Sequence, residues 1–395
     1  MSTLKVGAIR GVSASSDAIT VANDGSCTAK ITNNLSNRNL IINGAMQFAQ
    51  RGTSNNTGTD GYFTVDRIYY NSSGLDNNAT TSQADVASGT TPYTLGFRKC
   101  FKVTNANQSS GAGSSDKIEF RQRLEAHSIA NSGWNYKSDS SYITLSFWVK
   151  SSVAQNFYFY MLANDGTQQN FPMETGSLSA DTWTKITKTI PGNTNVQFDN
   201  DVNEGMTIVW DIFRGTDQTA GTVSLDTWAA FSSSARTPDQ TSTWYTTNGA
   251  TFEITGMQLE VGSVATDFEF RLFGDELLRC QRYYQISVSE SQPGVLAGRG
   301  TGTSTVHCSV PLACSMRAVP SLSDSDFSQV YAYLYDSRPH NGSSGTVTTN
   351  SSQFNSTGAY LTINVGGFGG NIDDDRVVNI GGYATNKKLI LNSEF

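Results

Sequence analysis

Short apolar runs separated by clusters of Gly, Asn, Ser and Asp recur along most of this chain, and this alternation limits what it can fold into. Between Leu40 and Val264 the runs are rich in Val, Ile, Phe, Tyr and Trp. Such residues favour extended strands, and the polar clusters between them favour turns. The pattern therefore predicts an all-β protein. The clearest expected strands are Thr64–Tyr70, Phe97–Thr104, Lys117–Leu124, Tyr142–Lys150, Asn156–Leu162, Trp183–Ile190, Thr207–Phe213 and Thr251–Leu259.

The length of 395 residues exceeds the size at which a single hydrophobic core usually stops growing, so we expect several domains. Eight expected strands over residues 40–265 predict a jelly-roll β-sandwich with long loops. Apolar and charged residues at helical spacing over 266–285 predict a short helical connector. Strand-like runs return over 286–395 and predict a second, smaller β-sandwich.

The first 39 residues form a separate segment in this organisation. They contain two strand-like runs but are too short and too polar to bury a core of their own. We expect a neighbour to stabilise them, whether the rest of the chain, a sister subunit or a larger assembly. A leader without fixed structure is the alternative.

Composition and charge exclude several classes of function. The formal net charge is −7 and no run of Lys or Arg occurs, which argues against nucleic acid as a partner. No apolar segment is long enough for membrane insertion, and Met1–Lys5 lacks the apolar core of a signal peptide. The five cysteines are irregularly spaced, so we expect buried apolar residues and neither a disulfide framework nor a zinc site. Synthesis in the cytoplasm fits this pattern.

Four short motifs occur in a fixed order along the chain. They are Asn39–Gly52 with Tyr62–Arg67, then Leu145–Ser151, then Ile254–Gly262 followed by Phe268–Arg271 and Cys280–Tyr284, and finally Met316–Ser321. In this order they resemble the receptor-binding and tail-fibre proteins of tailed bacteriophages. The second motif resembles the central strand of the carbohydrate-binding jelly rolls in such fibres, and the fourth resembles the element that opens their terminal domain.

The resemblance implies a non-enzymatic virion component. It implies a homotrimer or another homo-oligomer, made in the host cytoplasm and located in the phage tail, which binds a host surface polysaccharide. Residues 1–39 would attach to other virion proteins, with Leu4, Val6 and Ile9 as the contact residues. No heptad run or collagen-like repeat is present, which implies a short fibre. A capsid-decorating or tail-collar protein with mainly an assembly role is the alternative.

Aromatic residues are the candidates for glycan binding, because a sugar's C–H face stacks on an aromatic ring. Trp148 and Trp210 lie inside apolar runs and are expected in the core, whereas Trp183 is expected in the core or at its rim. The loop aromatics that we select as glycan-binding candidates are Trp134, Tyr136, Trp244 and Tyr245. The alternative is that these four rings pack on their own sandwich or on a sister subunit.

Three tyrosines recur at alternate positions in the C-terminal part of the chain. Tyr331, Tyr333 and Tyr335 would share one face of a strand. Such a ladder buries much area at an oligomer contact, so we interpret it as a subunit interface, with a sugar platform as the alternative.

No motif of an enzyme, cofactor site or metal site is found. The acidic clusters Asp373–Asp375 and Asp199–Glu204 lack the spacing of a calcium loop and are expected to be solvated turns. A structural calcium is possible, but we assign no metal ligands and no cofactor. A glycan hydrolase would need two carboxylates facing each other across a groove, a pairing that a sequence does not reveal. A glycan hydrolase is therefore the third function considered, after the tail fibre and the capsid or collar protein. The loops most suited to binding are 71–92, 105–115 and 214–248.

Overall fold

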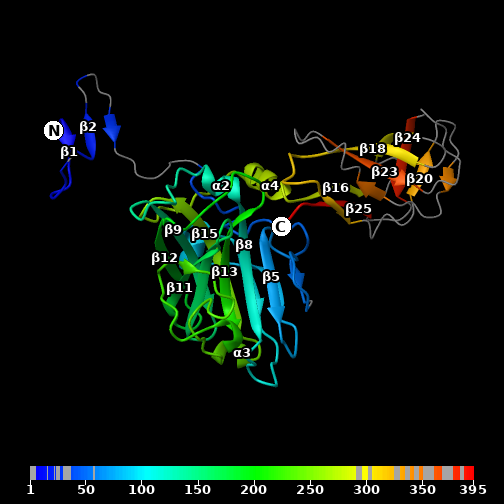
Figure 1. Cartoon of the computed structure of the whole chain (residues 1–395). Coiled ribbons are helices and arrows are strands. Elements are labelled where there is room, and N and C mark those ends of the chain that lie inside the picture. Colours follow the sequence, from blue (N-terminus) through cyan, green and yellow to red (C-terminus); the bar gives the residue numbers. More distant parts are fainter. Residues whose placement is uncertain are drawn as a thin grey trace.

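The computed structural model consists of a large β-sandwich, a small group of N-terminal strands and a group of C-terminal strands (Figure 1). The two smaller groups lie on opposite sides of the sandwich in this view. The described residues are 6–15, 17–21, 23, 27–29, 37–56, 58–290, 296–300, 305–323, 330–333, 339–341, 347–349, 360–366, 377–382 and 387–395.

Two six-stranded antiparallel sheets form the sandwich, which confirms the predicted all-β fold with a jelly-roll sandwich. Sheet I has the order β14 (Ala229–Ala230), β11 (Gln169–Ser177), β10 (Asn156–Ala163), β13 (Glu204–Arg214), β8 (Lys117–Glu125), β5 (Ile68–Ser73). Sheet II has the order β12 (Thr184–Pro191), β9 (Tyr142–Ser151), β15 (Thr251–Val261), β7 (Lys99–Thr104), β6 (Thr80–Asp85), β4 (Ser54–Asn55).

Short helices occur between these strands. They are α1 (Thr91–Thr94), α2 (Ala126–Ala130), the 3-10 turn η1 (Thr216–Gln218), α3 (Thr243–Thr246) and α4 (Phe273–Gln281). The last of them, α4, lies in the stretch for which a helical connector is predicted. No helix in the described part of the chain is long and apolar enough to span a membrane.

Alternation along each strand builds the core between the two sheets. In β13, Ile208 and Trp210 are buried in it, and the Trp210 ring stacks on Phe120 of β8 with the ring centroids 5.2 Å apart. The expectation that Trp210 is a core residue is confirmed. Trp148 is different, because its neighbours Phe147 and Val149 on β9 are the fully buried ones. Trp148 is half-buried on the outer face of sheet II, which corrects its predicted place in the core.

The remaining strands form three smaller sheets. The N-terminal sheet contains β1 (Ala8–Ile9), β2 (Ile19–Val21) and β3 (Cys27–Ala29). One C-terminal sheet has the order β16 (Tyr284–Glu290), β25 (Lys387–Asn392), β19 (Ser321–Ser323). The other has the order β21 (Pro339–Asn341), β20 (Val330–Tyr333), β24 (Val377–Gly382), β17 (Leu296–Gly300), β18 (Thr305–Pro311), β23 (Tyr360–Gly366), β22 (Val347–Thr349).

Three of the four cysteines whose side chains the structure describes are buried, as the sequence predicts. Cys100, Cys280 and Cys308 are buried and free, and Cys314 is free and half-buried. Burial raises the pKa of the Cys100 thiol to about 12, so this residue stays a neutral thiol at ordinary pH.

Candidate functional site

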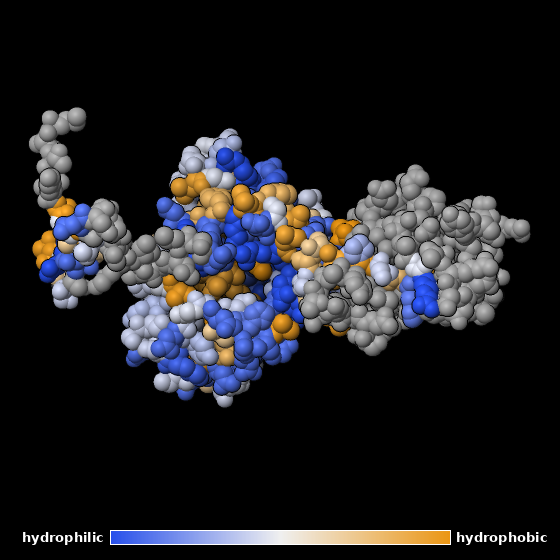
Figure 2. Space-filling model, turned by 90° about the horizontal axis from the view of Figure 1, so that it is seen from above, coloured by the Kyte–Doolittle hydropathy of each residue, from blue (hydrophilic) through white to orange (hydrophobic). Residues whose placement is uncertain are grey.

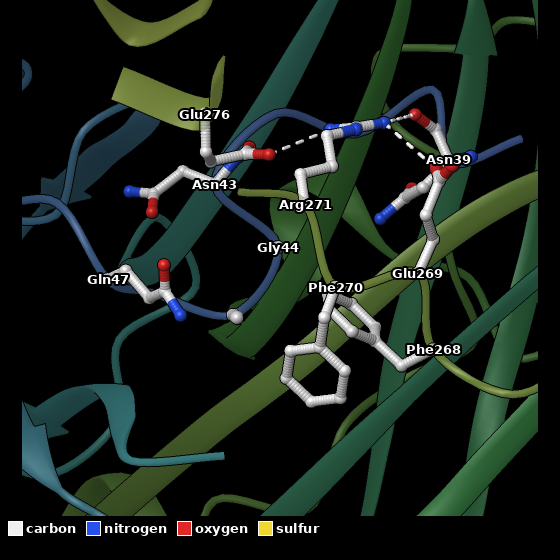
Figure 3. Close-up of a pocket in the computed structure, with 10 residues that line it drawn as sticks. Asn39, Asn43, Gly44, Gln47, Phe268, Glu269, Phe270, Arg271 and Glu276 are labelled. Atoms are coloured by element: carbon white, nitrogen blue, oxygen red, sulfur yellow. Dashed lines mark hydrogen bonds and ion pairs between the residues drawn. The ribbon is translucent and has the colours of Figure 1, made fainter. Parts of the chain in front are cut away.

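The sequence motifs meet at the junction between the sandwich and the C-terminal strands. Figure 3 shows the Arg271 guanidinium group at its centre. This group donates to Glu276 of α4 at 3.0 Å and to the backbone carbonyl of Asn39, and it lies 3.4 Å from the Glu269 carboxylate. The cavity beside it holds only about 10 Å³, which is room for a single water molecule. This network is therefore a structural clamp rather than a ligand site.

Two motif glycines explain how the segment after Asn39 fits against β15. The Met257 N–H donates to the Gly44 carbonyl at 2.9 Å, and a Cβ on Gly44 would collide with the Met257 carbonyl oxygen. Gly256 has a φ of +64°, and a Cβ there would lie 2.7 Å from the Phe97 ring. Gly44 excludes larger residues because two backbones approach each other closely, and Gly256 excludes them because of its left-handed backbone and the Phe97 ring.

Glu125 at the end of β8 holds the Cys280–Tyr284 motif. It accepts two hydrogen bonds of 2.7 Å from Arg282 and one from the Tyr283 hydroxyl. Burial alone would raise the pKa of Glu125, but the hydrogen bonds from Arg282 and Tyr283 outweigh it and lower the pKa below 4.5. Arg317, from the fourth motif, donates to the carbonyls of Ser393 at 2.6 Å and Val202 at 3.1 Å. These motif residues thus tie the C-terminal strands to the sandwich.

The loop aromatics predicted to bind glycan are core residues, and the prediction is wrong for three of them. Trp134, Trp244 and Tyr245 are 3%, 0% and 1% exposed. Their polar atoms are occupied inside the protein: Trp134 Nε1 donates to the Ser141 carbonyl, Trp244 Nε1 to the Thr251 carbonyl and the Tyr245 hydroxyl to Asp116. The rings close the ends of the sandwich and leave no face for a sugar. Tyr136 is half-buried and packs edge-on against Phe198 with the ring centroids 5.0 Å apart.

Other predicted contact residues stay predictions. Val6 and Ile9 are 46% and 52% exposed, whereas Leu4 lies outside the described residues. Tyr331 and Tyr333 are at alternate positions of β20, and Tyr335 lies outside the described residues.

An open groove crosses the outer face of sheet I, and we call it the outer-face groove. Its volume is about 410 Å³, within the usual range of small-ligand sites. The lining residues are Arg121, Arg123, Tyr160, Leu162, Asn164, Gln168, Glu204, Thr207, Phe231 and Arg236.

The floor of the outer-face groove is made by the outward positions of three adjacent strands. Thr207 of β13 pairs with Leu162 of β10 on one side and with Arg123 of β8 on the other. The loop after β13 forms one wall, where the Phe231 N–H donates to the Gln168 carbonyl at 2.9 Å. The Arg236 carbonyl accepts a hydrogen bond of 2.8 Å from the Asn170 side chain of β11. Both contacts lie at the start of β11, so the loop is anchored to this edge of the sheet.

Charge is concentrated in and beside this groove. Arg123 lies 3.4 Å from the Glu204 carboxylate, and Arg121 donates to Glu119 at 2.6 Å. Farther along the same outward face of β8 and β13, Arg214 donates to Asp211 at 2.6 and 2.9 Å and also to Glu119. Burial raises the pKa of Asp211 to about 8, against the opposing effect of the positive charges of Arg236, Arg121 and Lys117. Burial, and after it the nearby Arg236, lowers the pKa of Arg214 to about 9.

Sequence reasoning found part of this site. It selected the loop 214–248 for binding, and this loop supplies Phe231 and Arg236 to the groove. It missed Arg121 and Arg123, although the alternation with buried Phe120 and Leu124 in β8 places both on the outer face.

The outer face of sheet II carries a different pocket, of about 290 Å³. The segment before α4 lies across it, and Phe97, Phe268 and Phe270 form a triangle of rings with centroids 4.8–5.2 Å apart. Trp148 and Lys185 also line it. These rings pack mainly on one another, so their main role is structural.

Hydrophobic residues gather around α4 on the surface seen from above (Figure 2). Leu272 and Phe273 are 76% and 66% exposed, and Phe270 and Leu278 are 46% and 43% exposed. Contiguous apolar surface of this kind often marks a protein contact.

Among the residues that the structure describes, no group of three His, Cys, Asp or Glu side chains is arranged to hold a metal ion. The cluster Asp373–Asp375 lies outside those residues, and its interpretation as a solvated turn stays a prediction. Asp201 accepts a hydrogen bond from the backbone N–H of Asn203 at 2.9 Å, which is a turn interaction.

No protein-family model matches the chain, and no curated protein matches it. Among solved structures, the enzymatically active domain of tailspike protein 4 of bacteriophage CBA120 aligns at 10% identity and a TM-score of 0.30, over 57% of this chain and 21% of that chain. A structure described as CBM4 aligns at 15% identity and a TM-score of 0.27, over 56% and 99%. The CBM22-1–GH10 modules of Clostridium thermocellum xylanase 10B align at 9% identity and a TM-score of 0.26, over 56% and 30%. The chain thus spans about a fifth of the tailspike structure.

Proposed function

We propose that this chain is a non-enzymatic structural protein of a bacteriophage virion, a short tail fibre that binds a host surface glycan during adsorption. The outer-face groove is the observation that carries the binding part. It joins an open floor with aromatic, amide and guanidinium groups, the combination that holds sugar rings and their hydroxyls. The phage assignment rests on the four ordered motifs in the sequence.

Binding without catalysis is favoured by where the carboxylates lie. Glu119 and Asp211 are 0% and 1% exposed, and both are held by Arg214 beside the groove. A glycosidase needs an acid and a base that reach opposite sides of the glycosidic bond. Glu204 lines the groove, but it accepts a hydrogen bond from Thr207 and pairs with Arg123. A single groove would bind weakly, and several copies on one particle would strengthen adsorption through multivalency.

The test fills the outer-face groove. Leu162→Trp places a large ring on its floor, whereas Leu95→Trp places the same ring at the pocket of sheet II and is the matched control. We expect labelled Leu162→Trp protein to lose most binding to host cells and to a glycan array, while Leu95→Trp binds like the wild type. Equal binding of all three proteins would contradict the proposal.

The alternative is a capsid-decorating or tail-collar protein, and the exposed apolar surface around α4 favours it. Leu272 and Phe273 are more exposed than large apolar residues normally are in a protein without partners. Cryo-electron microscopy of intact particles with a bound antibody fragment separates the two functions. Label on the capsid or collar, rather than on the fibre tips, would replace the first proposal with the second.

A further inference from the structure

We propose that the outer-face groove selects an acidic saccharide, with the carboxylate of a uronic-acid ring held by the guanidinium group of Arg236. This inference rests on the proposed function and names the ligand class of the same groove.

The first step is the charge of the lining. Three arginines line the groove, and the only carboxylate among the lining residues is Glu204. Lys117 lies close by, and its pKa is lowered first by burial and then by the nearby guanidinium groups of Arg214 and Arg121. Positive charge is therefore crowded here, although the whole chain has a formal net charge of −7. Such a local excess favours an anionic ligand.

The second step is the state of each arginine. Arg121 is engaged by Glu119 and Arg123 by Glu204. Within the described part of the chain, no carboxylate lies within 4.0 Å of a guanidinium nitrogen of Arg236. Its Nε atom is buried and has no hydrogen-bond partner among the described residues. Asp211 and the Tyr160 hydroxyl also act on Arg236, but among the described residues it is the arginine of the groove lining that has no carboxylate within 4.0 Å.

The third step is that Arg236 is held in place before any ligand arrives. Its N–H donates to the Gln218 carbonyl at 3.1 Å, and its carbonyl accepts from Asn170 at 2.8 Å. Its guanidinium carbon lies 5.4 Å from the centroid of the Phe231 ring. A planar guanidinium group matches a carboxylate in two parallel hydrogen bonds, and the anchored backbone keeps this group at the groove.

The neighbouring groups fit the rest of a sugar. Phe231 offers an apolar ring beside Arg236, and the amides of Asn164 and Gln168 lie along the same wall. A neutral sugar would cover the Arg236 guanidinium group without supplying a counter-charge, at a desolvation cost that an acidic sugar offsets.

Isothermal titration calorimetry with the full chain tests this. The probes are tetragalacturonate and the same oligomer with its carboxyls methyl-esterified. We expect the acid form to bind at least about tenfold more tightly than the ester, and its affinity to fall as NaCl rises from about 50 to about 500 mM.

The variants assign the effect to one side chain. Arg236→Gln should weaken binding of the acid form by about ten- to a hundredfold and change binding of the ester less than about twofold. Arg236→Lys should give an intermediate affinity, because lysine keeps the positive charge but cannot donate two parallel hydrogen bonds to a carboxylate. The matched control is Arg98→Gln, an exposed arginine on the other side of the sandwich. Thermal unfolding of each variant confirms that it is folded.

Each possible result of these experiments either supports or overturns the inference. Equal affinity for acid and ester, no binding of the acid form, or equal effects of Arg236→Gln and Arg98→Gln would overturn the inference. A tetraglutamate peptide that binds as tightly as tetragalacturonate would also overturn it, because the groove would then recognise negative charge alone and not a sugar. Binding of the ester alone would leave the proposed function standing, whereas adsorption to host cells that is unaffected by Leu162→Trp would remove that function as well.

Discussion

The outer faces of the two sheets of the sandwich carry opposite chemistry, although both are crossed by a segment that joins other parts of the chain. Over sheet II the crossing segment brings Phe268 and Phe270 onto Phe97, and these apolar rings pack on one another beside a smaller pocket. Over sheet I the crossing loop brings Arg236 and Phe231 to a floor of polar groups and leaves a groove open. The comparison shows that a face can be covered for stability or left open for binding. Variants on the first face should therefore affect stability, and variants on the second should affect binding.

The largest effect is expected for Phe97→Ala on the covered face. Phe97 is 2% exposed and contacts both phenylalanines of the crossing segment. Removal of a buried Phe side chain should lower the free energy of unfolding by about 3–5 kcal/mol, because transfer free energy is lost and a cavity remains. Denaturant unfolding measures this change. A loss below about 1 kcal/mol would show that the rings over sheet II contribute little.

Gly256→Ala should have the next largest effect. Its left-handed backbone and the Phe97 ring at 2.7 Å both oppose a Cβ, so we expect a loss of about 2–4 kcal/mol. Gly176→Ala is the matched control, because Gly176 has a φ of +70° and no atom near its Cβ position. The control should lose only about 1 kcal/mol. Equal losses would mean that the close approach to Phe97 is irrelevant.

Glu125→Gln should weaken the junction by about 2 kcal/mol. It removes the charge that accepts two hydrogen bonds from Arg282 and one from Tyr283, and such charged hydrogen bonds are stronger than neutral ones. Asp139→Asn, at an exposed position, is the control. Thermal unfolding at pH 7 measures both variants, and equal melting temperatures would contradict the role given to Glu125.

The pH dependence of this difference can also be predicted. The pKa of Glu125 is lowered in the folded protein, so its contribution to stability is present above the ordinary value of 4.5 and is lost as the pH falls through the folded-state value. The gap in stability between wild type and Glu125→Gln should therefore shrink as the pH falls from about 6 to about 3. Unfolding curves at several pH values test this prediction. A difference in stability that grows as the pH falls would contradict the lowered pKa of Glu125.

The smallest effect on stability, with a measurable effect on binding, is expected for Phe231→Ala on the open face. Phe231 is half-buried in the loop wall of the groove. Its loss should change the free energy of unfolding by less than about 1 kcal/mol and weaken glycan binding by about two- to tenfold, through lost stacking. Calorimetry and thermal unfolding on the same preparation separate the two quantities. Unchanged affinity would move the sugar contact away from this wall.

The strands with apolar alternation were predictable from the sequence, and the polar ones were not. All eight expected sandwich strands are present, within a few residues of their predicted bounds. Two long strands were missed. β6 has the sequence TTSQAD, with no apolar alternation, and pairs with β4, which has only two residues. β11 contains Pro172, which argues against a central strand, and it tolerates the proline because its outer neighbour β14 is only two residues long.

The site was harder to predict than the fold, because exposure is a property of the folded chain. Trp134 and Trp244 stand in polar stretches, yet the loops fold back and bury both rings in the sandwich. Arg121 and Arg123 could have been placed outside by their alternation with Phe120. Arg236 could not, because only the path of its loop across sheet I brings it to the groove.

The way in which the C-terminal strands leave and rejoin the sandwich has a consequence for modularity. The chain departs at Tyr284 and returns at Asn392, and these two residues pair directly, beside the clamp formed by Arg317. Arg317 lies between them in the sequence and donates to the Val202 carbonyl of the sandwich. An exchange of the strands after Tyr284 for other strands would therefore have to keep both this pair and Arg317 to preserve the join to the sandwich.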